Sequence, residues 1–414
     1  MKITRTHKFF DTLLLTLLVF SGGGLLFKFH RNEFSVILLL VALFTIVFMG
    51  QQIKKSIFNS SLFTLILFSS LIILNYIIIN KFMIPESQEY LKYGFHLMNI
   101  TSCVLILTHF RNNRSTDYFL GIIRGILKLI LYFSILNFLV YFIIKESLTP
   151  AYGGWNNEYI ADTFSFIFFY NPEKHTFNIF GIELIRNQGW FWEPGVNMVY
   201  LNILLYLEGF VFKRGKWTIP LIVFAILTTY STTGIFIMII VLVLIFMKSI
   251  KRNPVVYGFL GLLIIYPLYY VAKSNVENKS VENASSMNKR IFDLVQPLLI
   301  ASDNPITGIG LDIEHFQKYR SEYHLSDETQ SLLTTETTEK GSSNSITFLM
   351  AATGFPMSLF LLYCLFKQNL FTYRKSIFMT IIVISVLSEP LLLRPFYLIL
   401  IVSGMFAFFN KFTK

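Results

Sequence analysis

Arginine and carboxylate side chains in two long polar stretches, residues 145–195 and 273–343, are the groups in this sequence best suited to chemistry. Arg186 and Glu193 lie in the first stretch, and Arg290 lies in the second. A guanidinium grips phosphate oxygens in pairs and stays charged at a membrane surface. A carboxylate can accept the proton of an attacking hydroxyl. These residue types predict an enzyme that acts on an anionic substrate.

The segment "RNQGWFWEPG", residues 186–195, also predicts local geometry. Gly189 and the Pro194-Gly195 pair favour a tight entry into a helix, and Pro194 suits its first turn, where a missing N–H costs little. Glu193 would then stand beside the positive end of the helix dipole, which favours its ionised form. A simpler interpretation remains open, in which Arg186 and Glu193 form an interfacial pair that only orients the helix.

The rest of the chain predicts a membrane protein, because 54% of its residues are hydrophobic and 14% are charged. A bilayer core requires roughly 20 apolar residues per helix. We expect an all-α polytopic protein with a single integral membrane domain over 1–414 and about 12 spans, of which the pairs 217–230/234–247 and 376–392/395–410 are short or tightly joined. The predicted spans are 12–29, 34–50, 57–79, 91–110, 118–144, 195–212, 217–230, 234–247, 254–272, 344–366, 376–392 and 395–410.

Lysine and arginine in the short connections set the expected orientation. They concentrate on one side, at Lys54, Lys55, Lys213, Arg214 and Lys251 for example, and are sparse on the other. Both termini are therefore expected in the cytoplasm, with the two long stretches as large loops outside it. The net charge of +11 is spread through these turns, which indicates contact with membrane lipids and not with nucleic acid.

Within the outer loops the pattern predicts two local elements. Residues 163–184 alternate around a turn at 171–174, as in a small surface hairpin, although a short interfacial helix also fits. Residues 286–302 predict an amphipathic helix, and "NPITGIG" after it forms either a turn or, less specifically, a phosphate loop. The apolar stripe of that helix holds Ile291, Leu294, Val295, Leu298 and Leu299.

The remaining titratable and sulfur-bearing residues carry weaker signals. Cys103 and Cys364 fall inside predicted spans, which leaves no disulfide framework, and the spacing of His315 and His324 matches no zinc motif. We therefore expect no metal and no cofactor. Arg124 and Lys128 are expected to snorkel or to face a polar cavity. A role as polar groups in helix packing fits equally well for Glu208, Glu389 and Arg394.

Four stretches, in this order, resemble the O-antigen polymerase and O-antigen ligase superfamily over roughly residues 180–414. The first is the motif made by Arg186, Gly189, Phe191, Glu193, Pro194 and Gly195. The others are "TYSTTG" at 229–234, the Arg, Asn-Pro and Gly-x-Gly pattern within 288–312, and the Asn-Ser step that opens 342–362. The Glu-bearing turn at 388–395 is also similar.

The resemblance implies a GT-C-like glycosyltransferase of the bacterial inner membrane. Its members polymerise surface-polysaccharide repeat units (O-antigen, capsule or exopolysaccharide) carried on undecaprenyl pyrophosphate, with a chain-length regulator protein as a further partner. Arg186 and Arg290 would hold the pyrophosphate, and Glu193 would act as base, with Asp312 or His315 as weaker candidates. The expected substrate-binding residues are Gly189, Asn304, Gly308, Gly310, Asp312, His315 and Asn344.

Two other functions stay open at this point. Twelve spans also suit a flippase or transporter of lipid-linked oligosaccharide, but such carriers usually have repeated halves and midplane sites. An O-antigen ligase is the other alternative. Ligases of the superfamily typically carry a histidine where this chain has Ser343, which favours the polymerase branch.

Overall fold

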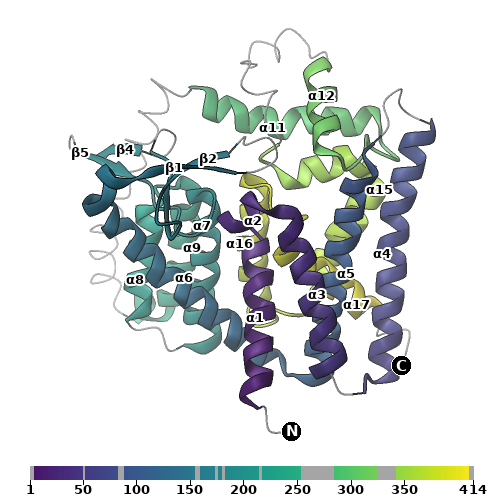
Figure 1. The fold of residues 1–414 in the computed structure, drawn as a ribbon, viewed down its shortest axis with the longest axis horizontal. Helices are drawn as coiled ribbons and strands as arrows, with labels where there is room; N and C mark the ends of the chain where they lie inside the picture. The colour runs from purple at the N-terminus through teal and green to yellow at the C-terminus, as the bar shows by residue number, and fades with distance from the viewer. Residues whose placement is uncertain are drawn as a thin grey trace.

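The computed structural model describes residues 4–49, 52–82, 88–153, 159–172, 176–179, 182–213, 217–252, 284–323 and 342–409. These residues are mostly helical (Figure 1). The helices before the first outer loop are α1 (Arg5–Ser21), α2 (Leu25–Phe29), α3 (Arg31–Met49), α4 (Lys55–Phe82), α5 (Tyr90–Asn113) and α6 (Thr116–Ile144). The later ones are α7 (Pro194–Tyr206), α8 (Thr218–Thr228), α9 (Thr232–Arg252), α11 (Ala284–Asp303), α12 (Ile313–Glu322), α15 (Ser345–Lys367), α16 (Lys375–Ser388) and α17 (Pro395–Phe409).

Helices occupy most of the predicted spans that the structure describes. The span 12–29, however, is broken by a turn at residues 22–24, and the helix in 376–392 ends at Ser388; the span 254–272 lies outside the described residues. Within the described ranges, five helices are long and apolar enough to cross a membrane, and α8, α9, α16 and α17 are shorter apolar helices. The count of twelve spans therefore stays a prediction. Large apolar side chains on the outside of α4, such as Phe63, Ile66 and Leu74, are exposed, as lipid-facing side chains would be.

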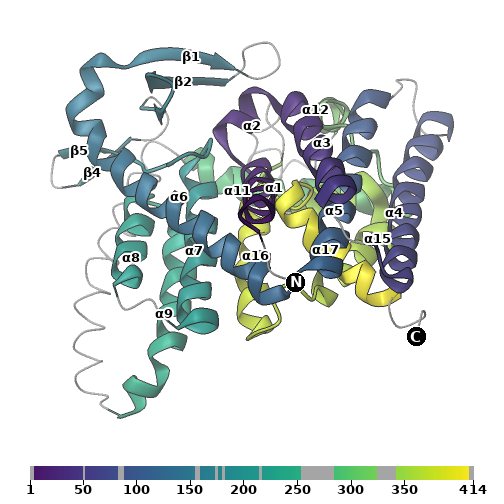
Figure 2. The same ribbon diagram turned by 60° about the horizontal axis from the view of Figure 1, so that its bottom comes forward.

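The helices form two groups that meet at α16. Helices α4, α5, α15 and α17 pack together with α1 and α3, whereas α7 packs against α8, α9 and α16. Figures 1 and 2 show α6–α9 on one side of α16 and α1, α3–α5 and α17 on the other. Both termini lie at the end of the bundle opposite to the strands and to α11 and α12 (Figure 1).

Between α6 and α7 the described residues form two small antiparallel sheets, which correct the all-α expectation. One sheet has the order β1 (Thr149–Gly153), β2 (Tyr159–Phe164), β3 (Phe168–Tyr170), and the other pairs β4 (Thr176–Ile179) with β5 (Ile182–Ile185). The expected strands are present, but their expected pairing around 171–174 is wrong. Strands β2 and β3 turn at Ser165 and Phe166 instead, where both residues have positive φ.

A buried ion cluster links α6 to the end of α7. Arg124 donates two hydrogen bonds to Glu208, at 2.8 and 3.0 Å, and Lys128 lies 3.2 Å from the same carboxylate. Glu208 is fully buried and lies in the π-helical turn Leu207–Phe212 that continues α7. Of the two expectations for Arg124 and Lys128, these contacts favour a polar environment within the bundle, because a carboxylate from a distant segment compensates both charges.

Replacing Glu208 with glutamine should destabilise the bundle by about 3 kcal/mol, because two partly buried cations lose their counter-charge. Thermal unfolding of the detergent-solubilised protein measures the effect. Glu146→Gln is the control, since its pair with Lys145 is exposed and 3.8 Å long and should contribute little. Equal unfolding temperatures for Glu208→Gln and Glu146→Gln would contradict the assignment.

Candidate functional site

The loop that contains Arg186 is fastened to three helices. The Asn187 amide donates to Thr228 Oγ1 at 2.8 Å, and its oxygen accepts from Ser134 at 3.1 Å and from Gly189 N at 3.2 Å. Asn197, in α7, donates to Ser134 Oγ at 2.7 Å. Gly189 has φ +55°, and a Cβ there would lie 3.0 Å from Ser134 Oγ, so the turn requires glycine. Ser134, Asn187 and Asn197 are buried, which makes the loop a rigid support.

Arg186 leaves this support at the C-terminal end of α8. Its Nε donates to the carbonyl oxygen of Thr229 at 3.1 Å, within the "TYSTTG" segment. The half-buried guanidinium is within electrostatic reach of Glu193, Glu389 and Arg290. Burial lowers the pKa of Arg186 below its ordinary value, while the carboxylates of Glu193 and Glu389 act in the opposite direction.

Arg290 lies on helix α11 and is exposed. Three residues further along α11, the buried Asp293 fixes the helix. Its carboxylate accepts from Ser343 Oγ at 2.6 Å and pairs with the fully buried Arg320 of α12 at 2.5 Å. Its backbone carbonyl accepts from Thr347 Oγ1 of α15 at 2.9 Å. These contacts bind α11 to the membrane bundle and thereby position Arg290.

Glu389 is the second carboxylate of the site, and it lies in the turn between α16 and α17. Ser345 at the start of α15 grips this turn: its hydroxyl donates to Glu389 O at 2.6 Å and accepts from Leu391 N at 2.8 Å. Glu389 is 7% exposed. Burial first, and then the nearby Glu193 charge, raise the pKa of Glu389 to about 8, although Arg290 and Arg186 oppose the shift.

Glu193 completes the group at the N-terminal end of α7. The helix begins at Pro194, as expected, and the carbonyl of Glu193 accepts from Val196 N at 3.1 Å and from Asn197 N at 3.2 Å. Its side chain is exposed. We call Arg186, Glu193, Arg290 and Glu389 the Arg–Glu cluster. It joins the segment before α7 and helix α11 to the α16–α17 turn, and it combines cations for an anion with carboxylates for a proton.

Other expected site residues have structural roles instead. The backbone N–H groups of Ile309 and Gly310 donate to the carbonyls of Ala351 and Ala352, both at 2.9 Å, and Gly308 N donates to Asn304 O at 3.0 Å. Gly308 and Gly310 have φ of +65° and +102°. They form a turn that packs on α15, and these amides are therefore not available to cradle a phosphate.

Asp312, His315 and Asn344 also lie in structural positions. Asn344 caps α15 through hydrogen bonds from Ile346 N and Thr347 N, at 3.0 and 3.1 Å. Asp312 caps α12 and accepts from Lys92 Nζ at 3.0 Å. Burial opposes ionisation of Asp312, but Lys92 and backbone N–H groups bring its pKa below the ordinary value. His315 is half-buried on α12, and His324 lies outside the described residues.

Glu389 was not among the catalytic residues expected from the sequence, so its place in the Arg–Glu cluster was not predicted. The "SEPLLLRP" turn was the available signal, because it is one of the stretches that resemble the superfamily. Among the residues that the structure describes, no group of three or more histidine, cysteine or acidic side chains is arranged to hold a metal ion.

Part of the region that carries this geometry is similar to a known protein family. The O-antigen ligase family model matches residues 217–364, about a third of the chain. Residues 217–364 are therefore similar to the O-antigen ligase family, and we call them the O-antigen ligase-family region. This region holds Thr229, Arg290, Asp293 and Ser345, so the superfamily resemblance seen in the sequence is confirmed. No curated protein and no solved structure matches the chain.

Outside the O-antigen ligase-family region, Gly195 provides the space that Glu389 occupies. A Cβ at Gly195 would lie 1.9 Å from Glu389 Oε1, so Gly195→Ala must displace the carboxylate. We expect any reaction at the Arg–Glu cluster to slow by about 10-fold or more, since small displacements of a reacting group are costly. The matched control is Gly121→Ala, because a Cβ at Gly121 meets nothing within 4 Å. Full activity of Gly195→Ala, at normal expression, would show that Glu389 needs no defined position.

Proposed function

We propose that this protein is a surface-polysaccharide polymerase that moves a growing glycan from a polyprenyl diphosphate to a lipid-linked repeat unit. In the reaction, a hydroxyl oxygen of the incoming repeat attacks the anomeric carbon of the donor sugar. The bond between that carbon and the diphosphate oxygen breaks, and its electron pair leaves with the diphosphate. The hydroxyl proton passes to a carboxylate of the Arg–Glu cluster.

The observation that supports this proposal is that Arg186 and Arg290 lie within electrostatic reach of Glu389, which packs against Gly195 two residues after Glu193. A leaving diphosphate develops negative charge, and fixed guanidinium groups stabilise it in the transition state. Glu389, with a pKa near 8, is matched to proton transfer near neutral pH. Glu193 raises that pKa and is the alternative base. Since the diphosphate donor is already activated, these residues suffice for the bond exchange.

A specific position favours polymerisation over ligation. Ligases of the superfamily typically carry a histidine where this chain has Ser343. Ser343 donates from both its backbone nitrogen, at 2.9 Å, and its hydroxyl, at 2.6 Å, to Asp293. The residue therefore anchors α11 and offers no imidazole for an acceptor. The asymmetric fold, with the Arg–Glu cluster near the end that carries the outer loops, also fits an enzyme better than a carrier with a midplane site.

Deletion of the gene in its host, followed by extraction of lipid-linked glycans, tests the proposal. A polymerase defect should leave single repeat units on the outer leaflet of the inner membrane and should abolish the ladder of long chains. Long chains that remain on the polyprenyl carrier would identify a ligase instead. Single repeats held on the inner leaflet would identify a flippase. Complementation with the wild-type chain controls for effects on neighbouring genes.

A further inference from the structure

A second group of cationic residues lies near the outer end of the bundle and takes no part in the Arg–Glu cluster. Arg31 begins α3, His96 lies on α5, and Arg394 ends the turn that begins with Glu389. Arg394 is within electrostatic reach of Arg31, and His96 is within reach of both arginines. All three side chains are half-buried. We call Arg31, His96 and Arg394 the cationic cluster.

Aromatic rings hold Arg394 without neutralising it. Its guanidinium carbon lies 5.2 Å from the centre of the Phe27 ring and 5.3 Å from that of Trp192. The ring-bearing segments are themselves joined, since Leu25 N donates to Trp190 O at 2.8 Å and Trp192 N donates to Gly23 O at 3.4 Å. The position of Arg394 is therefore built by three separate parts of the chain. Such rings attract a cation but leave its charge available to an anion.

The cationic cluster lacks a neutralising carboxylate within the described part of the chain. Neither Arg31 nor Arg394 forms an ion pair with an acidic residue there. Asp312 is within electrostatic reach of His96, but Lys92 binds it at 3.0 Å. Burial together with the charge of Arg31 brings the pKa of Arg394 well below its ordinary value. An anion placed between these side chains would relieve the repulsion.

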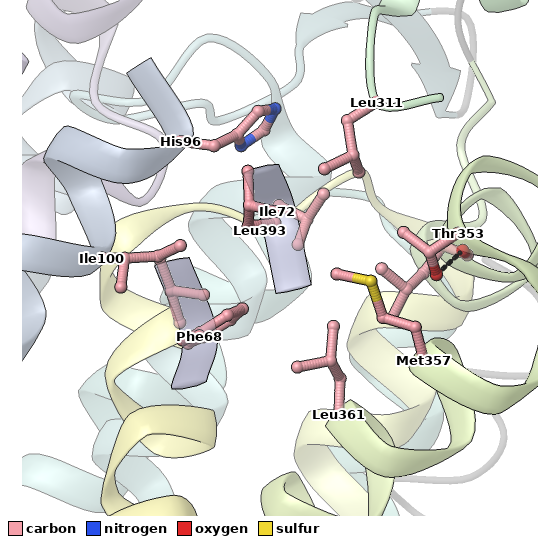
Figure 3. Close-up of a pocket in the computed structure, with 11 residues that line it drawn as sticks. Phe68, Ile72, His96, Ile100, Leu311, Thr353, Met357, Leu361 and Leu393 are labelled. Atoms are coloured by element: carbon pink, nitrogen blue, oxygen red, sulfur yellow. Dashed lines mark hydrogen bonds between the residues drawn. The ribbon is translucent and has the colours of Figure 1, made fainter. Parts of the chain in front are cut away.

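An apolar pocket lies next to the cationic cluster, inside the membrane bundle. Figure 3 shows His96 and Leu311 at one end of the pocket, with Phe68 and Leu361 at the other. Ile72 and Leu393 also line it, and Leu393 directly precedes Arg394. The pocket is small, with a volume of about 10 Å³, so it is a packed aliphatic wall beside the cationic cluster and not a channel for a hydrocarbon chain. A low-dielectric wall strengthens the attraction between the cationic side chains and an anion bound next to them.

We propose that Arg31, His96 and Arg394 bind the diphosphate of a second prenyl-linked substrate, namely the acceptor repeat unit. The inference rests on the proposed function, in which each reaction brings together two lipid diphosphates. The Arg–Glu cluster contains carboxylates and suits the diphosphate whose bond to sugar breaks. The cationic cluster contains none, and it suits a diphosphate that is held intact while its sugar hydroxyl reacts.

Native mass spectrometry of the purified full-length protein with farnesyl diphosphate, a short prenyl diphosphate, tests this inference. The wild type should bind two equivalents. The Arg31→Gln/Arg394→Gln and Arg186→Gln/Arg290→Gln variants should each keep one, with the lost site weakened about ten- to a hundredfold. Lys145→Gln, an exposed cation of the first outer loop, is the matched control and should keep two. Arg394→Lys retains the positive charge and should bind the second equivalent more tightly than the Arg31→Gln/Arg394→Gln variant does. This partial rescue would show that the lost binding is not a result of misfolding.

Three outcomes overturn the inference: a single equivalent in the wild type, a second equivalent that survives loss of Arg31 and Arg394, or equal displacement of both equivalents by inorganic pyrophosphate. The last outcome would assign the cationic cluster to free phosphate groups. Binding is measured without turnover, so these results do not depend on which glycan reaction the protein performs. Failure of the proposed function would instead appear as normal long chains in the deletion strain.

Discussion

Replacing Arg186 or Arg290 with glutamine should lower polymer formation by about 10²–10³-fold. Each variant lacks one fixed positive charge that would stabilise the departing diphosphate. The measurement is made in a polymer-deficient host that is complemented with each variant. The amount of laddered polysaccharide reports the activity. Arg186→Lys should restore only part of the activity, since lysine keeps the charge but loses the planar fork that binds two oxygens. Arg290 is exposed. Among the hydrogen bonds and ion pairs of the described residues, none involves Arg290, so its replacement should leave the fold intact.

The corresponding control is Arg320→Gln, which should act differently. Arg320 is fully buried, pairs with Asp293 and lies 4.3 Å from the Phe292 ring, so its loss loosens α12 and α11 and lowers stability as well as activity. A normal ladder from either Arg186→Gln or Arg290→Gln, at wild-type expression, would remove the guanidinium pair from the mechanism.

Replacing Glu389 with glutamine should nearly abolish activity and should also change how stability depends on pH. The pKa of Glu389 is about 8, and its ordinary value is 4.5, so the folded protein retains a proton that the unfolded chain releases between these values. The stability that Glu389 contributes is thus complete below about pH 4.5 and is lost as pH rises through about 8. Glutamine stays neutral, and the variant should unfold at a higher temperature than the wild type at pH 9.

The pH profile of the reaction identifies which carboxylate is the base. If Glu389 takes the proton, the wild-type rate should rise as pH passes through about 8. Glu193→Gln should then shift this rise toward lower pH, because the neighbouring negative charge that holds the Glu389 pKa high is gone. A rise that persists unchanged in Glu389→Gln would assign the proton to another group.

Local sequence patterns were sufficient to predict the elements whose causes are local. Pro194 and the apolar run after it define the start of α7, and the periodicity of 286–302 predicts α11. The stripe of that helix, however, is exposed at Ile291, Leu294 and Leu299, while Phe292 and Ile300 are buried. Amphipathic spacing finds a helix but does not say which apolar face meets protein and which meets lipid.

Contacts between distant segments could not be predicted in the same way. Glu208 meets Arg124 and Lys128 across more than 75 residues of sequence, and Glu389 meets Gly195 across a still longer separation. Each is an isolated charged residue in an apolar run, so no periodicity marks its partner. The arginines could be chosen as candidate site residues from the sequence, because a cation in a polar motif already suggests an anionic ligand. The packing role of the turn at Gly308 and Gly310 could not be predicted, because it depends on contact with α15.

The short turn from Glu389 to Arg394 carries one member of each cluster, and the Ser345 hydroxyl clamps it near its start. A shift at either end is therefore transmitted to the other through a few peptide bonds. If both clusters bind lipid diphosphates, saturating one cluster with its substrate should alter the apparent affinity of the other cluster for the second substrate. Initial-rate measurements should then show that the KM for one substrate depends on the concentration of the other.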